Sequence, residues 1–212
     1  MFCHPIQFGV ENNAIIWYNK NMEKRKSILV DVDEVICHAG LLKLMNKFLN
    51  TNYKLEEFTN YYIDDDVFKD EKTKKAFFDY YVTQDGYEDA ELLPYAKEAL
   101  EKLNEKYDIY ICSAFVMDGY EHLSGKFIMD KYNFLVKNFP FLDAKKFIFT
   151  GAKNLFEADV QLDDRLSNMK GNVKQKFMFL SYHNRNIPKE ELEKYNVVPV
   201  NGWKEVLEIL GE

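Results

Sequence analysis

The sequence has few cysteines, no long apolar run and no excess of positive charge. Its three cysteines, Cys3, Cys37 and Cys112, are too few and too scattered for a disulfide framework or a zinc site. No apolar segment approaches the roughly 20 residues that cross a membrane. The formal net charge of −7 disfavours nonspecific binding to nucleic acids or anionic membranes. We therefore expect a cytoplasmic protein with reduced thiols and with neither nucleic acid nor membrane among its partners.

The chain also lacks internal repeats, low-complexity tracts and flexible linkers. Its 212 residues suit one domain, or one domain with an insertion, and a hydrophobic content of 47% is ample for a core. Residues 1–25 lack the basic start and apolar core of a signal peptide. We assign them to an N-terminal extension of unknown role that carries a short apolar patch at 15–18, and we expect that a compact domain can begin at Met22.

The stretch from Ser27 to Gly40 carries the most informative pattern of the sequence, a buried strand followed by two aspartates. Its apolar run at 28–30 is typical of a strand buried on both faces, and Asp31 and Asp33 follow it. Residues two apart in an extended chain point to the same side, so both carboxylates can face one pocket at the end of the strand. Two carboxylates this close repel each other, and a bound cation or a shared proton would reduce this repulsion. An isolated Asp-x-Asp pair is more often a solvated loop or a helix cap, but the buried strand disfavours that interpretation.

Further patterns predict five more strands, at 107–112, 147–149, 159–162, 177–180 and 197–200. Helical spacing of apolar residues predicts helices at 39–50, from Pro94 onward, across 120–138, and after Asn201, which we expect to cap the last helix. Strands that alternate with helices indicate an α/β fold with a parallel, doubly wound sheet.

The segment from Thr51 to Leu93 has a different composition, with dense Tyr and Phe among many acids and lysines. Helical patterns fit it and strand patterns do not. We predict a small helical cap over the pocket, inserted after the first strand, with 38–93 as cap and 26–37 plus 94–212 as core domain. Most of its aromatic residues should be cap core. The run Asp64–Asp66 could indicate a metal, but acids at a helix start are the commoner explanation.

Residues suited to phosphate chemistry follow each of the first four core strands. In chain order they are Asp31 and Asp33, then Ser113, then Lys153, then Asp163 and Asp164. The ends of parallel strands meet at one edge of a sheet, so these side chains should converge. Carboxylates from two strands can hold Mg²⁺, a lysine and a serine can hold a phosphoryl group, and one acid is left to attack phosphorus.

This set resembles the four motifs of the haloacid-dehalogenase-like (HAD) superfamily. The stretch TGAKNLFEADVQLDDR at 150–165 is similar to the cytosolic and mitochondrial 5′(3′)-deoxyribonucleotidases, as are LLPYAKEAL, Lys131–Tyr132 and His183–Asn184. The resemblance covers roughly residues 26–211. It implies a HAD-like Rossmannoid sheet with a cap, and a Mg²⁺-dependent phosphatase that hydrolyses (deoxy)ribonucleoside monophosphates, with pyrimidine deoxynucleotides indicated, through an aspartyl-phosphate.

The resemblance also implies roles for individual residues. Asp31 would be the nucleophile. Asp33 would protonate the leaving sugar oxygen and then activate water, with its pKa raised by Asp31 and the substrate phosphate. Lys153 and Ser113, with Ala114 beside them, would hold the phosphoryl group. Mg²⁺ would be bound by Asp31, the backbone carbonyl of Asp33 and Asp164, with Asp163 a second ligand or a support.

Two residues depart from the mammalian pattern. Glu34 stands where those enzymes have glycine, and Ala114 stands where they carry a second hydroxyl, so a weaker grip on phosphate is expected. Arg165 is a weaker site candidate, since an arginine after paired acids can simply neutralise them. The histidines at 38, 122 and 183 are expected to be structural or exposed rather than catalytic.

Other functions stay open at this point. The chain could be a HAD phosphatase for another small phosphate ester, a dehalogenase, which would need neither Asp33 nor a metal, or a catalytically silent binding module. The complete motif set argues against a silent module. We also leave open whether the chain forms a homodimer.

Overall fold

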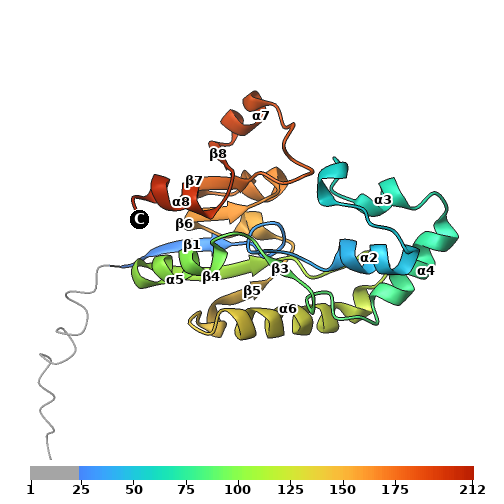
Figure 1. The fold of residues 1–212 in the computed structure, drawn as a ribbon. Helices are drawn as coiled ribbons and strands as arrows, with labels where there is room; N and C mark the ends of the chain where they lie inside the picture. Colours follow the sequence, from blue (N-terminus) through green and yellow to red (C-terminus); the bar gives the residue numbers. More distant parts are fainter. Residues whose placement is uncertain (1–23) are drawn as a thin grey trace, which may run out of the picture.

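A single six-stranded parallel sheet forms the centre of the protein in the computed structural model, which describes residues 24–212 (Figure 1). The apolar patch predicted at 15–18 lies outside the described residues. The strands are β1 (Lys26–Val30), β4 (Tyr107–Ser113), β5 (Phe147–Phe149), β6 (Ala158–Asp163), β7 (Val173–Phe179) and β8 (Val197–Val200). All six predicted core strands are thus confirmed, with β7 beginning four residues before the predicted start at 177.

The strand order, β5-β4-β1-β6-β7-β8, places β1 beside both β4 and β6. All neighbours pair in parallel. The order of the strands along the chain reverses between β1 and β6, and open α/β sheets bind ligands at such a reversal, beyond the carboxyl ends of the strands. Aspartates lie at the ends of the two strands at this point: Asp31 directly follows β1, and Asp163 is the last residue of β6.

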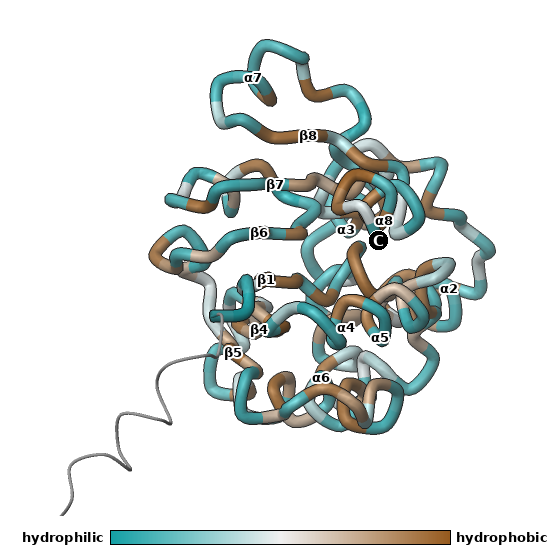
Figure 2. Tube along the Cα trace, turned by 90° about the vertical axis from the view of Figure 1, so that its left-hand side faces the viewer, coloured by the Kyte–Doolittle hydropathy of each residue, from teal (hydrophilic) through white to brown (hydrophobic). Residues whose placement is uncertain are grey.

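One face of the sheet carries the main hydrophobic core. Parallel register aligns Val30 with Ile111 on one side and with Leu162 on the other, so apolar side chains form a continuous layer. Helices α5 (Ala96–Lys106), α6 (Ser124–Asn138) and α8 (Trp203–Leu210) pack on this layer. The brown apolar segments of the tube in Figure 2 include parts of β1 and β8. The opposite face is covered more thinly, by Met169 and by α7 (Lys189–Lys194).

The C-terminal helix also reaches the turn that follows the first strand. The indole Nε1 of Trp203 donates a hydrogen bond to the backbone carbonyl of Val35 at 2.8 Å, across a separation of 168 residues. Both residues are buried. The turn carrying Asp33 and Glu34 is therefore held by the last helix of the chain.

Two predicted helix starts are wrong. Asn201 does not cap α8, because both its backbone N–H and its side-chain amide donate to Glu205, and Gly202 occupies the N-cap position. The helix expected from Pro94 begins at Ala96, after Tyr95 in a left-handed conformation at φ +64°.

The insertion has a small core of its own. Its helices are α2 (Leu41–Leu49), α3 (Ile63–Val67) and α4 (Glu71–Tyr81), and Figure 1 shows them grouped to one side of the sheet. Phe68 and Phe77 stack at its centre with ring centroids 5.1 Å apart, packed with Met45. The acidic run 64–66 forms the first turn of α3, as predicted, and Asp64 pairs with Lys74 at 2.8 Å.

The insertion is nevertheless not purely helical. Where the chain leaves and re-enters the core, β2 (Cys37–His38) pairs antiparallel with β3 (Glu91–Leu92). Strands of two residues are too short to produce an alternating pattern, which is why the sequence did not predict them. The division into core and cap at 37/38 and 93/94 stays a prediction. None of the helices in residues 24–212 is long and apolar enough to span a membrane.

Candidate active site

Three buried aspartates meet beyond the ends of β1 and β6. Asp31 follows β1 directly, while Asp163 is the last residue of β6 and Asp164 follows it. One carboxylate oxygen from each lies within 4.8 Å of the others. Since β1 and β6 are neighbours in register, with Val30 beside Leu162, the residues that follow them have to lie together. The predicted convergence of these acids is therefore present.

One lysine is buried among them. Lys153 lies in a short 3₁₀ turn, η4 (Lys153–Leu155), and is 3% exposed. Its Nζ lies 2.5 Å from Asp31 Oδ2 and 2.9 Å from Asp163 Oδ2. Burial opposes the charge of the ammonium group, but the two carboxylates raise the pKa of Lys153 above its ordinary value. Lys153 thus lies with the strand-end acids, as the predicted convergence requires, and it forms two ion pairs with them.

The cluster has more negative than positive charge. Burial raises the pKa of Asp31, and repulsion from Asp163 adds to it while Lys153 opposes it. Burial also raises the pKa of Asp163 and of Asp164. One lysine cannot balance three carboxylates, and carboxylate oxygens are the ligands that a hard divalent cation prefers. The donor set therefore fits Mg²⁺.

Asp33 points away from this cluster, toward α6 and the returning end of the insertion. Its Oδ2 accepts from Lys131 Nζ at 2.8 Å, and its Oδ1 accepts from the Tyr87 hydroxyl at 2.5 Å. Burial acts to raise the pKa of Asp33, but the charge of Lys131 and these hydrogen bonds lower it overall. The sequence did not show that a lysine from α6 reaches this carboxylate and lowers its pKa; the rise expected beside a substrate phosphate stays a prediction.

Lys131 joins two motifs that are far apart in the chain. Besides Asp33, its Nζ donates to Ser113 Oγ and to the Ala114 carbonyl, each at 2.7 Å. The ammonium group is almost fully buried, and Ser113 is fully buried at the end of β4. In the sequence, Lys131 belongs to a stretch that carries the resemblance, but it was not predicted to be a site residue. Ala114 contributes its backbone oxygen here, not its side chain.

Two further residues orient Asp164. His183 Nε2 lies 2.8 Å from Asp164 Oδ2, and the Asn184 amide donates to the Asp164 carbonyl at 2.7 Å. Both follow β7, whose end lies beside that of β6. His183 is thus a structural residue, as expected, but its partner is one of the acids of the site. In the sequence, the His183–Asn184 pair noted within the resemblance was the only indication that these residues contact the site.

Glu34, the extra acid of this sequence, does not join the cluster. It lies in a left-handed conformation at φ +59°, and its carboxylate contacts His38 Nδ1 at 3.0 Å and accepts from Ser181 Oγ at 2.5 Å. It therefore ties the turn after β1 to the loop after β7.

Arg165 does not neutralise the paired acids, contrary to expectation. Its guanidinium lies 4.0 Å from the centroid of the Tyr61 ring, and among the described residues it forms no ion pair. Its backbone N–H donates to Asp163 Oδ1 at 2.9 Å. The arginine therefore connects the core to the insertion.

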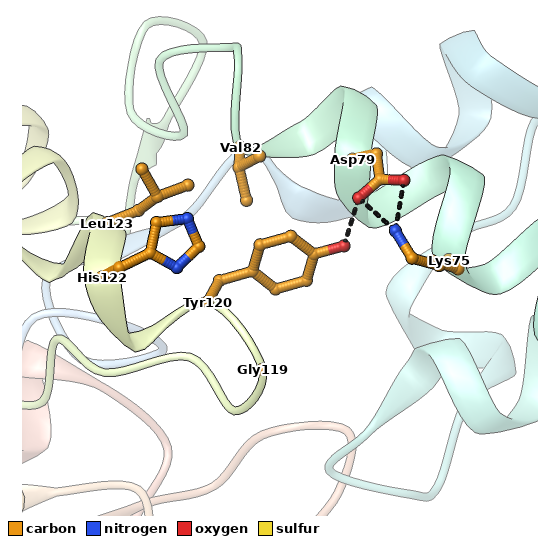
Figure 3. A pocket seen from close by; sticks show the side chains of 7 residues that line it. All are labelled: Lys75, Asp79, Val82, Gly119, Tyr120, His122 and Leu123. Carbon is orange, nitrogen blue, oxygen red and sulfur yellow. Dashed lines mark hydrogen bonds and ion pairs between the residues drawn. The ribbon is translucent and has the colours of Figure 1, made fainter.

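A cavity of about 590 Å³ lies between α4 and the loop that precedes α6 (Figure 3). The Tyr120 hydroxyl points to Asp79 at 2.7 Å, and Asp79 also pairs with Lys75. None of the acidic site residues lines this cavity. It is a second place where the insertion contacts the core, distinct from the acid cluster.

Comparisons with known proteins agree with this geometry. Residues 25–210 match the model of the family described as 5′ nucleotidase, deoxy (pyrimidine), cytosolic type C protein. A Staphylococcus aureus (strain MSSA476) protein whose name contains 5′(3′)-deoxyribonucleotidase is 30% identical over 190 residues, which cover 86% of this chain and 93% of that protein. The Bacillus subtilis (strain 168) 5′(3′)-deoxyribonucleotidase is 23% identical over 194 residues, covering 86% of this chain and 96% of that protein.

Solved structures show the same fold. A haloacid dehalogenase-like family hydrolase from Streptococcus pneumoniae superimposes with a TM-score of 0.51 at 14% identity, covering 89% of this chain and all of that one. A haloacid dehalogenase-like hydrolase from Burkholderia xenovorans gives a TM-score of 0.53 at 12% identity, with 87% and 96% covered. The HAD-like fold predicted from the motifs is thereby confirmed. The chain belongs to the 5′ nucleotidase, deoxy (pyrimidine), cytosolic type C family, and it is a hydrolase of the phosphatase type.

Proposed function

We propose that the protein hydrolyses (deoxy)ribonucleoside monophosphates to nucleoside and phosphate, with Mg²⁺, through an aspartyl-phosphate on Asp31. The observation that carries the proposal is the buried cluster of Asp31, Asp163 and Asp164 around Lys153, with Asp33 two residues beyond the nucleophile. The names of the relatives as 5′(3′)-deoxyribonucleotidases support this substrate class.

In this proposal Asp31 is the nucleophile. Its Oδ1 accepts the backbone N–H of Val32 at 2.7 Å, and its Oδ2 pairs with Lys153. Attack on phosphorus forms the Asp31–phosphate bond and breaks the bond to the sugar oxygen. Lys153 and Ser113 stabilise the negative charge of the transferring group, since fixed donors in a buried site stabilise developing charge strongly.

Asp33 is the general acid for the leaving oxygen and the general base for the water that cleaves the intermediate. Lys131 now holds its pKa low. A phosphate dianion bound near Ser113 competes for the same ammonium group and adds negative charge, and both effects raise the pKa of Asp33. Protonation of the acid is thereby linked to arrival of the substrate.

The residues that would hold Mg²⁺ are Asp31, Asp164 and the backbone carbonyl of Asp33, with Asp163 as a second ligand or a support. When bound, the ion supplies positive charge that the protein lacks at the acid cluster, and so neutralises the phosphoryl oxygens. His183 and Asn184 keep Asp164 in place for this task.

The base of the nucleotide has to be recognised by the insertion. Most aromatic side chains there are packed in its own core, but Tyr61 and Tyr62 are 40% and 56% exposed. Stacking on a base contributes about 1–3 kcal/mol where it has been measured. One such contact corresponds to a preference of about five- to 150-fold over esters without a base.

A panel of phosphate esters at matched Mg²⁺ and pH tests the proposal. We expect higher kcat/KM for nucleoside monophosphates than for sugar phosphates or glycerol phosphate, and loss of activity in EDTA. Asp31→Asn is the matched control: it should fold and show no turnover, because an amide does not attack phosphorus. A clear preference for a sugar phosphate would exclude the nucleotidase while leaving a phosphatase.

A further inference from the structure

The contact between Tyr87 and Asp33 joins the insertion to the catalytic strand. Tyr87 lies between α4 and β3, 54 residues from Asp33, and its hydroxyl donates to Asp33 Oδ1 at 2.5 Å. The ring is held independently of this bond: it packs against Phe134 with centroids 5.3 Å apart, and Lys131 Nζ lies 5.6 Å from its centroid. The hydroxyl therefore adds one interaction to a ring that is already fixed.

The direction of this hydrogen bond distinguishes the two oxygens of Asp33. A phenol with an ordinary pKa of about 10 keeps its proton at neutral pH. The hydroxyl is thus the donor and Oδ1 is the acceptor, so the proton of the acid form of Asp33 has to be on Oδ2.

Oδ2 is also the oxygen that faces the phosphate-holding groups. It lies 2.8 Å from Lys131 Nζ, which is 2.7 Å from Ser113 Oγ. A phosphate ester bound by Lys131 and Ser113 would have its leaving oxygen on this side of Asp33. A proton on Oδ2 therefore points toward that oxygen. If Tyr87 did not hold Oδ1, rotation about the side-chain bonds would let either oxygen, or neither, face that place.

We propose that Tyr87 is a positioning residue for the general acid: its hydroxyl fixes the Asp33 carboxyl so that Oδ2 transfers the proton to the leaving sugar oxygen. The proposal rests on the proposed phosphatase function. It identifies a hydroxyl from the insertion, and not only the strand-end motifs, as a part of the proton-transfer apparatus.

The test is Tyr87→Phe, which removes the hydroxyl and keeps the ring. We expect kcat on a nucleoside monophosphate to fall about tenfold to a hundredfold, a part of the 10²–10⁴-fold that general acid catalysis supplies. The loss on p-nitrophenyl phosphate should be much smaller, because an aryl oxide departs without a proton. A merely structural role would lower both rates by the same factor. Tyr107→Phe, at the opposite end of the sheet, is the control and should leave both rates unchanged.

Two further measurements complete the test. Tyr87→Leu also lacks the hydroxyl but keeps an apolar contact to Phe134, and it should show the same selective loss. In an Asp33→Asn background, Tyr87→Phe should cause no additional loss. Equal losses on both esters, an additive loss in that background, or unchanged nucleotide hydrolysis would overturn the role of Tyr87 while leaving the phosphatase standing. A wild-type chain inactive on every ester would instead remove the proposed function, and the inference with it.

Discussion

Glu34 occupies a position where an L-residue is strained. Its φ of +59° is a conformation that glycine adopts at no cost, yet the carboxylate makes contacts that glycine could not make. One oxygen contacts His38 and the other accepts from Ser181. These contacts offset the strain and hold the turn beside Asp33.

The His38–Glu34 contact makes stability depend on pH. The hydrogen bond to Glu34 raises the pKa of His38 above 6.5, so the folded state binds the proton more tightly than the unfolded chain. The resulting stabilisation is complete below about pH 6.5 and is lost as pH rises through the folded pKa. We expect His38→Gln to lower the free energy of unfolding more at pH 5.5 than at pH 8.5, as measured by urea denaturation.

The exposed His122 provides the comparison for this measurement. His122→Gln should show a smaller pH-dependent change, since no ion pair to it occurs within residues 24–212. If the cost of His38→Gln were equal at both pH values, or larger at pH 8.5, the contact with Glu34 would not stabilise the fold.

Individual site residues could be predicted where they directly follow a strand. Parallel strands bring their ends to one edge, so the positions of Asp31, Ser113 and Asp163 follow from the strand pattern alone. Tyr87 approaches Asp33 from the insertion, and Lys131 approaches it from the eighth residue of α6. Only the three-dimensional packing determines where their side chains end. The contacts of Asp33, and hence the lowering of its pKa by Lys131, could therefore not be predicted from the sequence.

At the scale of elements, the turn η4 shows how the backbone positions Lys153, a residue of the proposed site. Gly171 lies against it: a Cβ added at Gly171 would be 2.7 Å from the Asn154 carbonyl oxygen and 3.1 Å from its carbonyl carbon and Cα. Asn154 follows Lys153 directly. The absence of a side chain at Gly171 thus lets the turn that carries Lys153 approach the loop before β7.

We expect Gly171→Ala to destabilise the protein by about 1–3 kcal/mol, the usual cost of overpacking, because backbone and not a flexible side chain is in the way. Displacement of η4 should also lower kcat by moving Lys153. Gly125→Ala, in α6 with open space around the new methyl group, is the control and should be neutral or slightly stabilising. Chemical denaturation and steady-state assays of both variants check this; a Gly171→Ala protein as stable and active as the wild type would contradict it.

Elements with an apolar pattern were predictable, down to the three residues of β5, and strands of two residues were not. The spacing of apolar residues was sufficient for α2, α6 and the core strands. The β2–β3 pair has two residues in each strand and is stabilised by tertiary position, not by pattern. The start of α8 was misplaced because the side chain of Asn201 donates to Glu205 instead of accepting from the helix.

At the scale of the whole molecule, the family match begins at residue 25 and every proposed site residue lies beyond it. The sheet and the three hydrophobic clusters described above are likewise formed by the described residues. The resemblance noted in the sequence, over roughly residues 26–211, has nearly the same range as this match, because the motifs and alternating elements all lie there.

We therefore expect deletion of Met1–Asn21 to leave kcat/KM and the melting temperature nearly unchanged. The full-length chain, prepared in parallel, is the reference for both measurements. An insoluble or inactive truncated protein would show that the apolar patch at 15–18 packs on the domain and that its boundary lies earlier.

The hydrogen bond from Trp203 to Val35 has a consequence for how the protein is made. Contacts between residues far apart in sequence form late, since long loops have to close first. During synthesis the turn beside Asp33 emerges early, whereas its hydrogen-bond donor Trp203 in α8 follows 168 residues after Val35. A nascent chain, or one clipped before Trp203, thus contains Asp31 and Asp33 without one of the contacts that hold their turn, so this part of the proposed site is completed only after α8 has packed.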